Sequence, residues 1–77
     1  MVENRLRDLR EDHDLYQKDI AKILHMSQVQ YSRYETGMRS MPIHLLIKLA
    51  KYYDVSLDYL TGITNLKKEY PKDKVRN

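Results

Sequence analysis

The stretch that most constrains the fold is residues 17–36, QKDIAKILHMSQVQYSRYET, where only three residues separate two short helical patterns. Apolar residues recur at helix-face spacing in both halves, as Ile20, Ala21, Ile23 and Leu24 and then as Val29, Tyr31 and Tyr34. A connection as short as His25-Met26-Ser27 forces a sharp corner. Ala21 is small enough to lie where two helices cross closely. The sequence therefore predicts two closely packed helices, 17–25 and 28–36.

The second of these helices has a polar outward face. Ser27 offers an oxygen to the N–H groups that open the helix, and Gly37 follows its end, where a left-handed residue is favoured. If Tyr31 and Tyr34 point inward, the opposite face carries four polar residues with Val29 near the edge: Gln28, Gln30, Ser32 and Arg33. Glutamine pairs with adenine and arginine with guanine, each worth roughly 1–3 kcal/mol of discrimination. An ordinary solvated surface is the alternative, although Glu and Lys are more typical of one.

The chain as a whole is short and lacks cysteine. Its 77 residues correspond to one domain, and without cysteine neither disulfides nor thiolate metal sites are possible. The longest aliphatic run is only Leu45-Leu46-Ile47, so we expect no membrane span and no signal peptide. These features predict a cytoplasmic protein with a modest core.

The net charge of +3 is concentrated at the C-terminal end. Residues 65–77 hold five basic and two acidic residues, whereas residues 1–64 hold nine of each. Overall charge is therefore weak evidence for nucleic-acid binding, which depends on how charges are arranged on faces. We predict a folded domain over residues 1–64 and a basic, flexible tail over residues 65–77.

Three further helices complete the predicted fold. An apolar stripe from Val2 to His13 predicts the first helix, in which His13 either caps the end or packs on the stripe. Asp14, which tolerates a left-handed conformation, then breaks the pattern. Pro42 opens a helix over residues 43–53, and a short helix over residues 57–61 lies between a Ser56 cap and Gly62. With no strand pattern, the fold class is all-α.

Four separated motifs resemble the phage repressor and Cro-type helix-turn-helix domains, the XRE family. They are NRLRDLRED, QKDIAKILHMS, YSRYETGMRSMP and LLIKLAKYYDVSLDYL, spread over residues 4–62. The resemblance implies a compact five-helix, lambda-repressor-like DNA-binding domain. It implies base contacts from Gln28, Val29 and Arg33, with Gln30 and Ser32 at the edge of the groove. It implies phosphate contacts from Gln17, Lys18, Ser27 and Arg39.

The resemblance also suggests an ion pair between Arg10 and Glu35. Physical reasoning supports the pair, because Glu35 lies near the C-terminal end of a helix, where an anion needs a nearby cation. The pair would stabilise the domain rather than contact DNA.

The sequence departs from the family pattern at three positions. His25 replaces a usual corner glycine, so it must adopt a strained conformation or loosen the turn. Tyr16 replaces a usual Ser or Thr cap, and Asp19 can supply half of a capping box. Tyr31 replaces a usual aliphatic residue, and its hydroxyl needs a partner if it is buried. These departures affect local geometry but not the predicted fold.

The predicted function is sequence-specific binding of double-stranded DNA by a transcriptional regulator, most simply a repressor. One domain makes few base contacts, so we expect a homodimer on a palindromic operator with half-sites about 34 Å apart. The candidate dimer interface is the last predicted helix and the residues just after it, with four candidate residues: Leu57, Tyr59, Thr61 and Ile63. The alternative for Leu57 and Ile63 is that they close the core.

Other classes of function have less support. The histidines His13, His25 and His44 match no metal-ligand or catalytic spacing, and there is no glycine-rich phosphate loop. We therefore expect no enzyme activity, cofactor, metal or small-molecule ligand. A protein-interaction module, such as an antitoxin or controller protein with a toxin or polymerase as partner, is the alternative function. Such a surface would offer apolar anchors, and only Val29 qualifies on the polar face. A-form RNA does not admit a recognition helix, which disfavours RNA.

Overall fold

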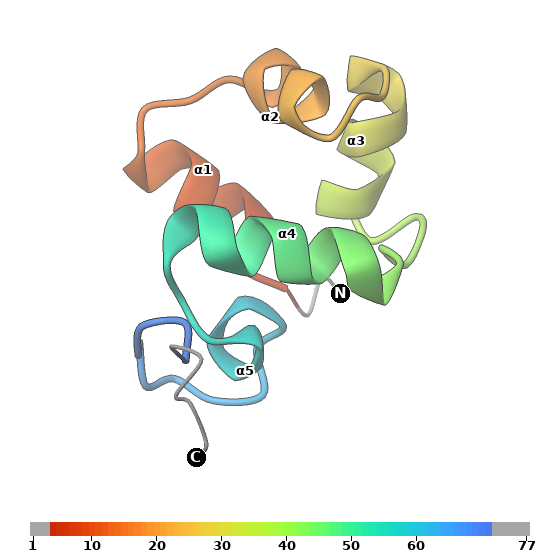
Figure 1. Cartoon of the computed structure of the whole chain (residues 1–77). Coiled ribbons are helices and arrows are strands. Elements are labelled where there is room, and N and C mark those ends of the chain that lie inside the picture. The colour runs from red at the N-terminus through yellow and green to blue at the C-terminus, as the bar shows by residue number, and fades with distance from the viewer. Residues whose placement is uncertain (1–3, 72–77) are drawn as a thin grey trace.

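The computed structural model describes residues 4–71, and this part of the chain contains five helices and no strand. They are α1 (Leu6–Asp12), α2 (Gln17–Ile23), α3 (Gln28–Glu35), α4 (Ile43–Tyr53) and α5 (Leu57–Leu60). Figure 1 shows α2 and α3 at one end of the molecule and α5 at the other, with α1 and α4 between them. The predicted all-α, five-helix fold is confirmed. None of the helices in residues 4–71 has the length and apolar character needed to cross a membrane.

One hydrophobic core joins all five helices. Tyr31 of α3 is fully buried within it, and Tyr34 is only 8% exposed, so the second half of the corner points both tyrosines inward as predicted. In a chain without Phe or Trp, tyrosine supplies the large core side chains. The other members are aliphatic, apart from Tyr53: Leu6, Leu9, Ile20, Ala21, Leu24, Leu49, Ala50, Tyr53, Val55 and Leu60.

Left-handed residues end the helices. Asp14 has φ 57° and His25 has φ 58°, so both predicted departures from ordinary backbone are confirmed. After His25, the Met26 N–H donates to the Ala21 carbonyl at 2.9 Å, which closes α2 and turns the chain into α3. A left-handed conformation is costly for a residue with a Cβ atom, so the corner stores strain at His25.

Side chains cap the helix starts where the sequence predicted them. The Ser27 Oγ accepts from the Gln30 N–H at 3.1 Å, and the Ser56 Oγ accepts from the Tyr59 N–H at 3.1 Å. At α2, the Asp19 carboxylate accepts from the Tyr16 N–H at 2.8 Å, the expected half of a capping box. The replacement of a Ser or Thr cap by Tyr16 is thus compensated locally.

Helix boundaries differ modestly from the prediction. α1 begins at Leu6 rather than at residue 2, with Arg5 as its N-cap residue. The turn before it is held by the Asn4 side-chain oxygen, which accepts from the Leu6 N–H at 3.0 Å, and by the Arg5 N–H, which donates to the Leu60 carbonyl at 2.8 Å. Val2 lies outside the described residues. The predicted ends of α2, α3 and α5 fall one or two residues late, because the last residues of each prediction form the cap and turn. α4 has its predicted bounds.

The predicted tail is described as far as residue 71, and this part lies against the bundle. The Lys68 carbonyl accepts from the Ser56 N–H at 2.9 Å. The Tyr70 N–H donates to Asp54 at 3.2 Å, and the Lys51 ammonium lies 5.7 Å from the centre of the Tyr70 ring. The boundary at residue 64 and the flexibility of the tail stay predictions, and residues 72–77 lie outside the described part.

Candidate nucleic-acid interface

The corner between α2 and α3 presents the outward face of α3 to solvent. Ala21, 2% exposed, packs in the core beside Ile20 and Leu24, and the chain turns within Leu24 to Ser27. Because Tyr31 and Tyr34 fix the inner side of α3, its opposite side is outside. Of the five predicted base-reading residues, Ser32 is half-buried. The other four are exposed: Gln28, Val29, Gln30 and Arg33.

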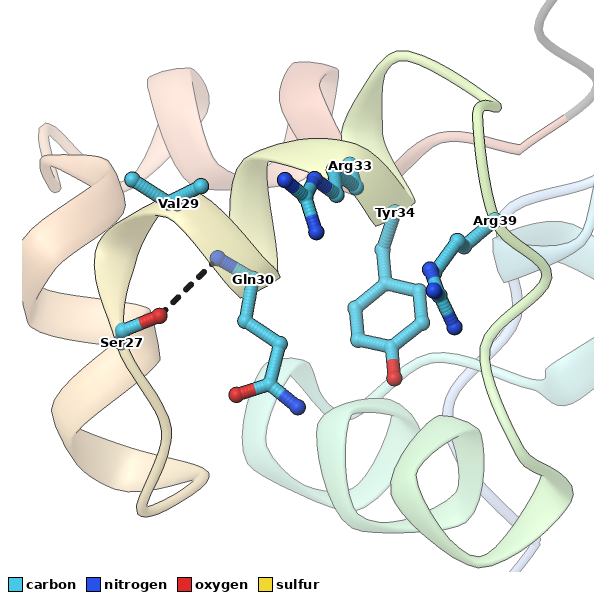
Figure 2. Close-up of a pocket in the computed structure, with 6 residues that line it drawn as sticks. All are labelled: Ser27, Val29, Gln30, Arg33, Tyr34 and Arg39. Atoms are coloured by element: carbon cyan, nitrogen blue, oxygen red, sulfur yellow. Dashed lines mark hydrogen bonds between the residues drawn. The ribbon is translucent and has the colours of Figure 1, made fainter.

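Two shallow hollows flank this outward face. The first is lined by Ser27, Val29, Gln30, Arg33, Tyr34 and Arg39 (Figure 2). The second is lined by Gln17, Gln28, Val29, Ser32, Arg33, Thr36 and Met38. Val29 and Arg33 lie on the ridge between them, and no carboxylate lines either hollow. The face is therefore electropositive, although residues 1–64 carry no net charge.

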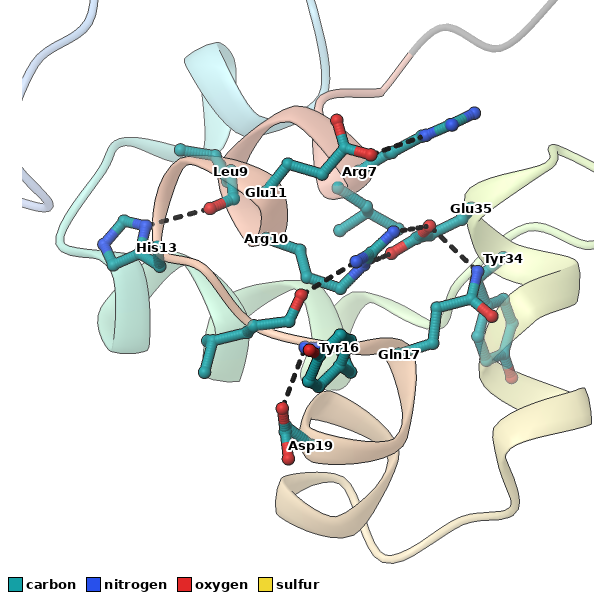
Figure 3. A network of polar contacts seen from close by, with 12 residues as sticks. Arg7, Leu9, Arg10, Glu11, His13, Tyr16, Gln17, Asp19, Tyr34 and Glu35 are labelled. Atoms are coloured by element: carbon teal, nitrogen blue, oxygen red, sulfur yellow. Dashed lines mark hydrogen bonds and ion pairs between the residues drawn. The ribbon is translucent and has the colours of Figure 1, made fainter.

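A chain of side-chain amides connects this face to the interior. The Gln28 amide N–H donates to the Gln17 side-chain oxygen at 3.5 Å. The Gln17 amide N–H in turn donates to Glu35 at 3.1 Å, as Figure 3 shows. Gln17 is the first residue of α2 and half-buried, so Glu35 fixes the orientation of its amide. The second amide hydrogen of Gln17 is left for another acceptor.

Arg10 and Glu35 lie together behind this chain. The guanidinium donates to the carboxylate from Nε at 2.6 Å and from Nη2 at 3.2 Å, and Nη1 donates to the Leu15 carbonyl at 2.8 Å. The Arg10 side chain is 11% exposed and that of Glu35 is 2% exposed. A bidentate pair of this kind holds α1, the start of α2 and the end of α3 in one arrangement (Figure 3).

The charge state of Glu35 follows from its surroundings. Burial alone would raise the pKa of its carboxyl, but interactions with Arg10 first, and then with the Tyr31 hydroxyl and the Gln17 amide, outweigh burial and lower that pKa. Close by, burial and then the negative charge of Glu35 raise the pKa of the Tyr31 hydroxyl. Within residues 4–71 no hydrogen bond of ordinary length and angle reaches the buried hydroxyls of Tyr31 and Tyr53. The Glu35 carboxylate nevertheless interacts with the Tyr31 hydroxyl, so it is the acceptor next to the hydroxyl that was expected to need one.

The predicted phosphate-binding residues surround α3 at several points. The Ser27 hydroxyl caps α3 and is exposed. Arg39 is exposed, and its backbone N–H donates to the Arg33 carbonyl at 3.1 Å, which holds the loop after α3 against the helix. Lys18 on α2 is exposed, with its ammonium 5.6 Å from the centre of the Tyr16 ring.

The candidate dimer residues belong to α5 and the segment just after it, and Figure 1 shows α5 at the opposite end of the molecule from α2 and α3. Leu57 and Tyr59 are half-buried against the core, and the Arg5 guanidinium lies 4.4 Å from the centre of the Tyr59 ring. The Thr61 hydroxyl donates to the Leu57 carbonyl at 2.7 Å. Ile63 is 77% exposed, so it does not close the core, whereas Leu57 does.

Three residues that the sequence did not assign line the hollows. Tyr34 had only a core interpretation, from its inward helical position, yet it also lines the first hollow. Thr36 and Met38, which flank Gly37, line the second. The only sign in the sequence that these three residues belong to the site was their position in or next to a helix predicted to read DNA. The spacing of apolar residues shows which side of a helix is buried, but not which surface the end of a side chain reaches.

Two short helices at a tight corner, with a polar and electropositive second helix, define a helix-turn-helix unit. Consistently, the helix-turn-helix family model matches residues 6–60, and the chain belongs to this family. The resemblance to phage-repressor-type domains is thereby confirmed.

Curated relatives support this assignment. The chain is similar to the uncharacterized HTH-type transcriptional regulator YobD of Bacillus subtilis, with 38% identity over 61 residues, 79% of this chain and 54% of YobD. It is 33% identical over 78 aligned positions to the cryptic phage CTXphi transcriptional repressor RstR of Vibrio cholerae, covering 99% of this chain and 69% of RstR. It is 32% identical over 62 residues to the antitoxin PezA of Streptococcus pneumoniae, 80% of this chain and 39% of PezA. The chain thus spans only part of each relative, and no solved structure matches it.

Proposed function

We propose that the protein is a sequence-specific regulator of transcription that binds double-stranded DNA, most simply as a repressor that occupies an operator. The observation that carries this proposal is the outward face of α3, which exposes Gln28, Val29, Gln30 and Arg33 between two hollows without a carboxylate. Several relatives, among them a phage repressor, have names that state transcriptional regulation.

In this proposal α3 lies in the major groove. Gln28, Val29 and Arg33 reach base edges, and Gln30 and Ser32 lie at the edge of the groove. Val29, 63% exposed, can contact a thymine methyl group, while Arg33 suits guanine and Gln28 suits adenine. Phosphates on either side bind the residues around α3: Gln17, Lys18, Ser27 and Arg39.

Glu35 holds the Gln17 amide in one orientation, in which it can donate to a phosphate. The hydrogen bond from Gln17 to Glu35 leaves one amide hydrogen free, on a side chain that no longer rotates freely. Holding a donor in its binding orientation lowers the entropy lost on binding. The buried ion pair thus supports DNA binding without contacting DNA.

The same proposal includes a homodimer on a palindromic site, with half-sites about 34 Å apart. The interface comprises α5 and the residues just after it, with Leu57, Tyr59, Thr61 and Ile63 as its candidates. Figure 1 shows α5 at the end of the molecule away from α3. Ile63 is its apolar centre, because it is exposed while Leu57 and Tyr59 also pack on the core. The basic residues of 65–77 add salt-dependent affinity that does not depend on sequence.

The test separates base reading from anchoring. Arg33→Ala should cost roughly 1–3 kcal/mol on the preferred site and relax base choice at one position, whereas Gln17→Ala should weaken binding to all sequences alike. Lys51→Ala is the matched control: it also removes one positive charge, but Lys51 lies by Tyr70, at the junction of α4 and α5. Equal losses on preferred and random DNA for Arg33→Ala would remove Arg33 from the base-reading residues.

A protein partner is the second candidate ligand, and the similarity to the antitoxin PezA favours it. A partner that bound the α3 face would need apolar anchors, and among the residues that line the two hollows only Val29 and Met38 offer exposed aliphatic surface. Failure of folded protein to select any DNA sequence would favour this candidate.

A further inference from the structure

Tyr34 lies at the boundary between the core and the DNA-binding face. Its ring is buried with the whole side chain only 8% exposed, yet Tyr34 lines the first hollow. Figure 2 shows its hydroxyl on the same side as the Gln30 amide and the Arg39 guanidinium. The hydroxyls of Tyr31 and Tyr53 are fully buried, whereas the Tyr34 hydroxyl is not among the fully buried groups that lack a partner. The packed ring of Tyr34 therefore holds its hydroxyl in one place, where it can bind a group in the first hollow.

The chemistry of this hollow suits an oxyanion. Its donors are two guanidinium groups, one amide and two hydroxyls, contributed by Arg33, Arg39, Gln30, Ser27 and Tyr34. No carboxylate lines it, and within residues 4–71 neither guanidinium forms an ion pair. Guanidinium and hydroxyl groups together match the several acceptor oxygens of a phosphate.

We propose that the first hollow binds one phosphate of the DNA backbone, with the Tyr34 hydroxyl and the Arg39 guanidinium as donors. This inference rests on the proposed function and adds a contact residue to it. A backbone phosphate fits better than a base edge, because the buried ring keeps the Tyr34 hydroxyl at the helix surface. Exposed side chains such as Gln28 and Val29 extend further, toward the floor of the groove.

Tyr34→Phe isolates the proposed contact. The substitution removes only the hydroxyl and keeps the ring that packs in the core, so the domain should melt at the temperature of the wild type. Tyr52→Phe is the matched control, since Tyr52 is 47% exposed on α4 and lines neither hollow. Binding is measured by fluorescence anisotropy on labelled duplexes of about two helical turns, one random and one enriched from a random library.

Tyr34→Phe should bind both duplexes about tenfold more weakly than the wild type does. A loss of this size corresponds to one hydrogen bond to a charged group. Tyr52→Phe should bind like the wild type. Neutral methylphosphonate groups, placed at one backbone position at a time, identify the phosphate. At one position the substitution should weaken the wild type more than it weakens Tyr34→Phe, because the variant has already lost one of the two donors to that phosphate and keeps only Arg39. At every other position the substitution should weaken the two proteins equally.

Two outcomes would overturn the inference alone. Equal binding by Tyr34→Phe and the wild type would show that the hydroxyl makes no contact. A loss confined to the enriched duplex would show a base contact instead of a phosphate contact. Wild-type protein that is folded but binds neither duplex would overturn the proposed function, and this inference with it.

Discussion

Replacing Arg10 with methionine should cost the domain a large part of its stability. Methionine keeps an apolar stem but removes three hydrogen bonds, two to Glu35 and one to the Leu15 carbonyl. The Glu35 carboxylate, 2% exposed, then keeps the bond from Gln17 but loses its cation. Removing one partner of a buried pair costs about 3–5 kcal/mol. A domain of this size has only about 4–12 kcal/mol in total, so the melting temperature should fall steeply.

The pH dependence of this loss tests the mechanism. In the wild type the pKa of Glu35 is below its usual value of 4.5, so its contribution is present above that value and disappears as the pH falls through the folded pKa. In Arg10→Met burial is no longer offset by the guanidinium, so the pKa of Glu35 rises and acid neutralises the unpaired charge. Urea unfolding followed by circular dichroism should show the gap between the two proteins narrowing from pH 7 to about pH 4.

Two further variants control for other causes. Arg7→Met removes the same side chain from an exposed pair with Glu11, where the two side chains are 70% and 53% exposed, and should change stability by less than about 0.5 kcal/mol. The double variant Arg10→Met/Glu35→Leu removes both charges and should recover most of the lost stability. A gap that is the same at both pH values, or Arg10→Met as stable as Arg7→Met, would refute the reasoning.

Two other predictions concern the corner and the dimer. His25→Gly relieves a left-handed residue at φ 58° and should stabilise the domain by about 1 kcal/mol, seen as a higher melting temperature; a lower one would show that His25 makes a stabilising contact. Ile63→Asp places a charge at the proposed apolar centre of the dimer, so sedimentation should show a shift toward monomer at a concentration where the wild type is dimeric. An unchanged mass with an unchanged melting temperature would exclude that surface.

Local features of the fold could be predicted because local residues determine them. The caps at Ser27 and Ser56, the half capping box from Asp19 and the left-handed turn at Asp14 all depend on neighbours within a few residues. The periodic spacing of apolar residues likewise placed Tyr31 inside. The predicted start of α1 was wrong because Asn4 and Arg5 form a turn before Leu6, and the spacing of apolar residues does not reveal such a turn.

Features that depend on the packed structure could not be predicted. The bond between Gln17 and Glu35 joins residues 18 positions apart, and it forms only once the start of α2 packs beside the end of α3. Residues 65–71 pack against the bundle through contacts of Tyr70 with Asp54 and Lys51. The composition of that segment indicated only a basic tail. For Tyr34, the sequence showed the side on which the ring lies but not that its hydroxyl reaches a hollow.

The most direct test of the central claim is selection of DNA by the purified protein from a random duplex library at physiological salt, followed by sequencing of the retained molecules. The account predicts enrichment of a two-fold symmetric site with half-sites about one helical turn apart. It also predicts that Arg33→Ala relaxes one position in each half-site. Folded protein that enriches no sequence would contradict the account and make a protein partner the favoured ligand.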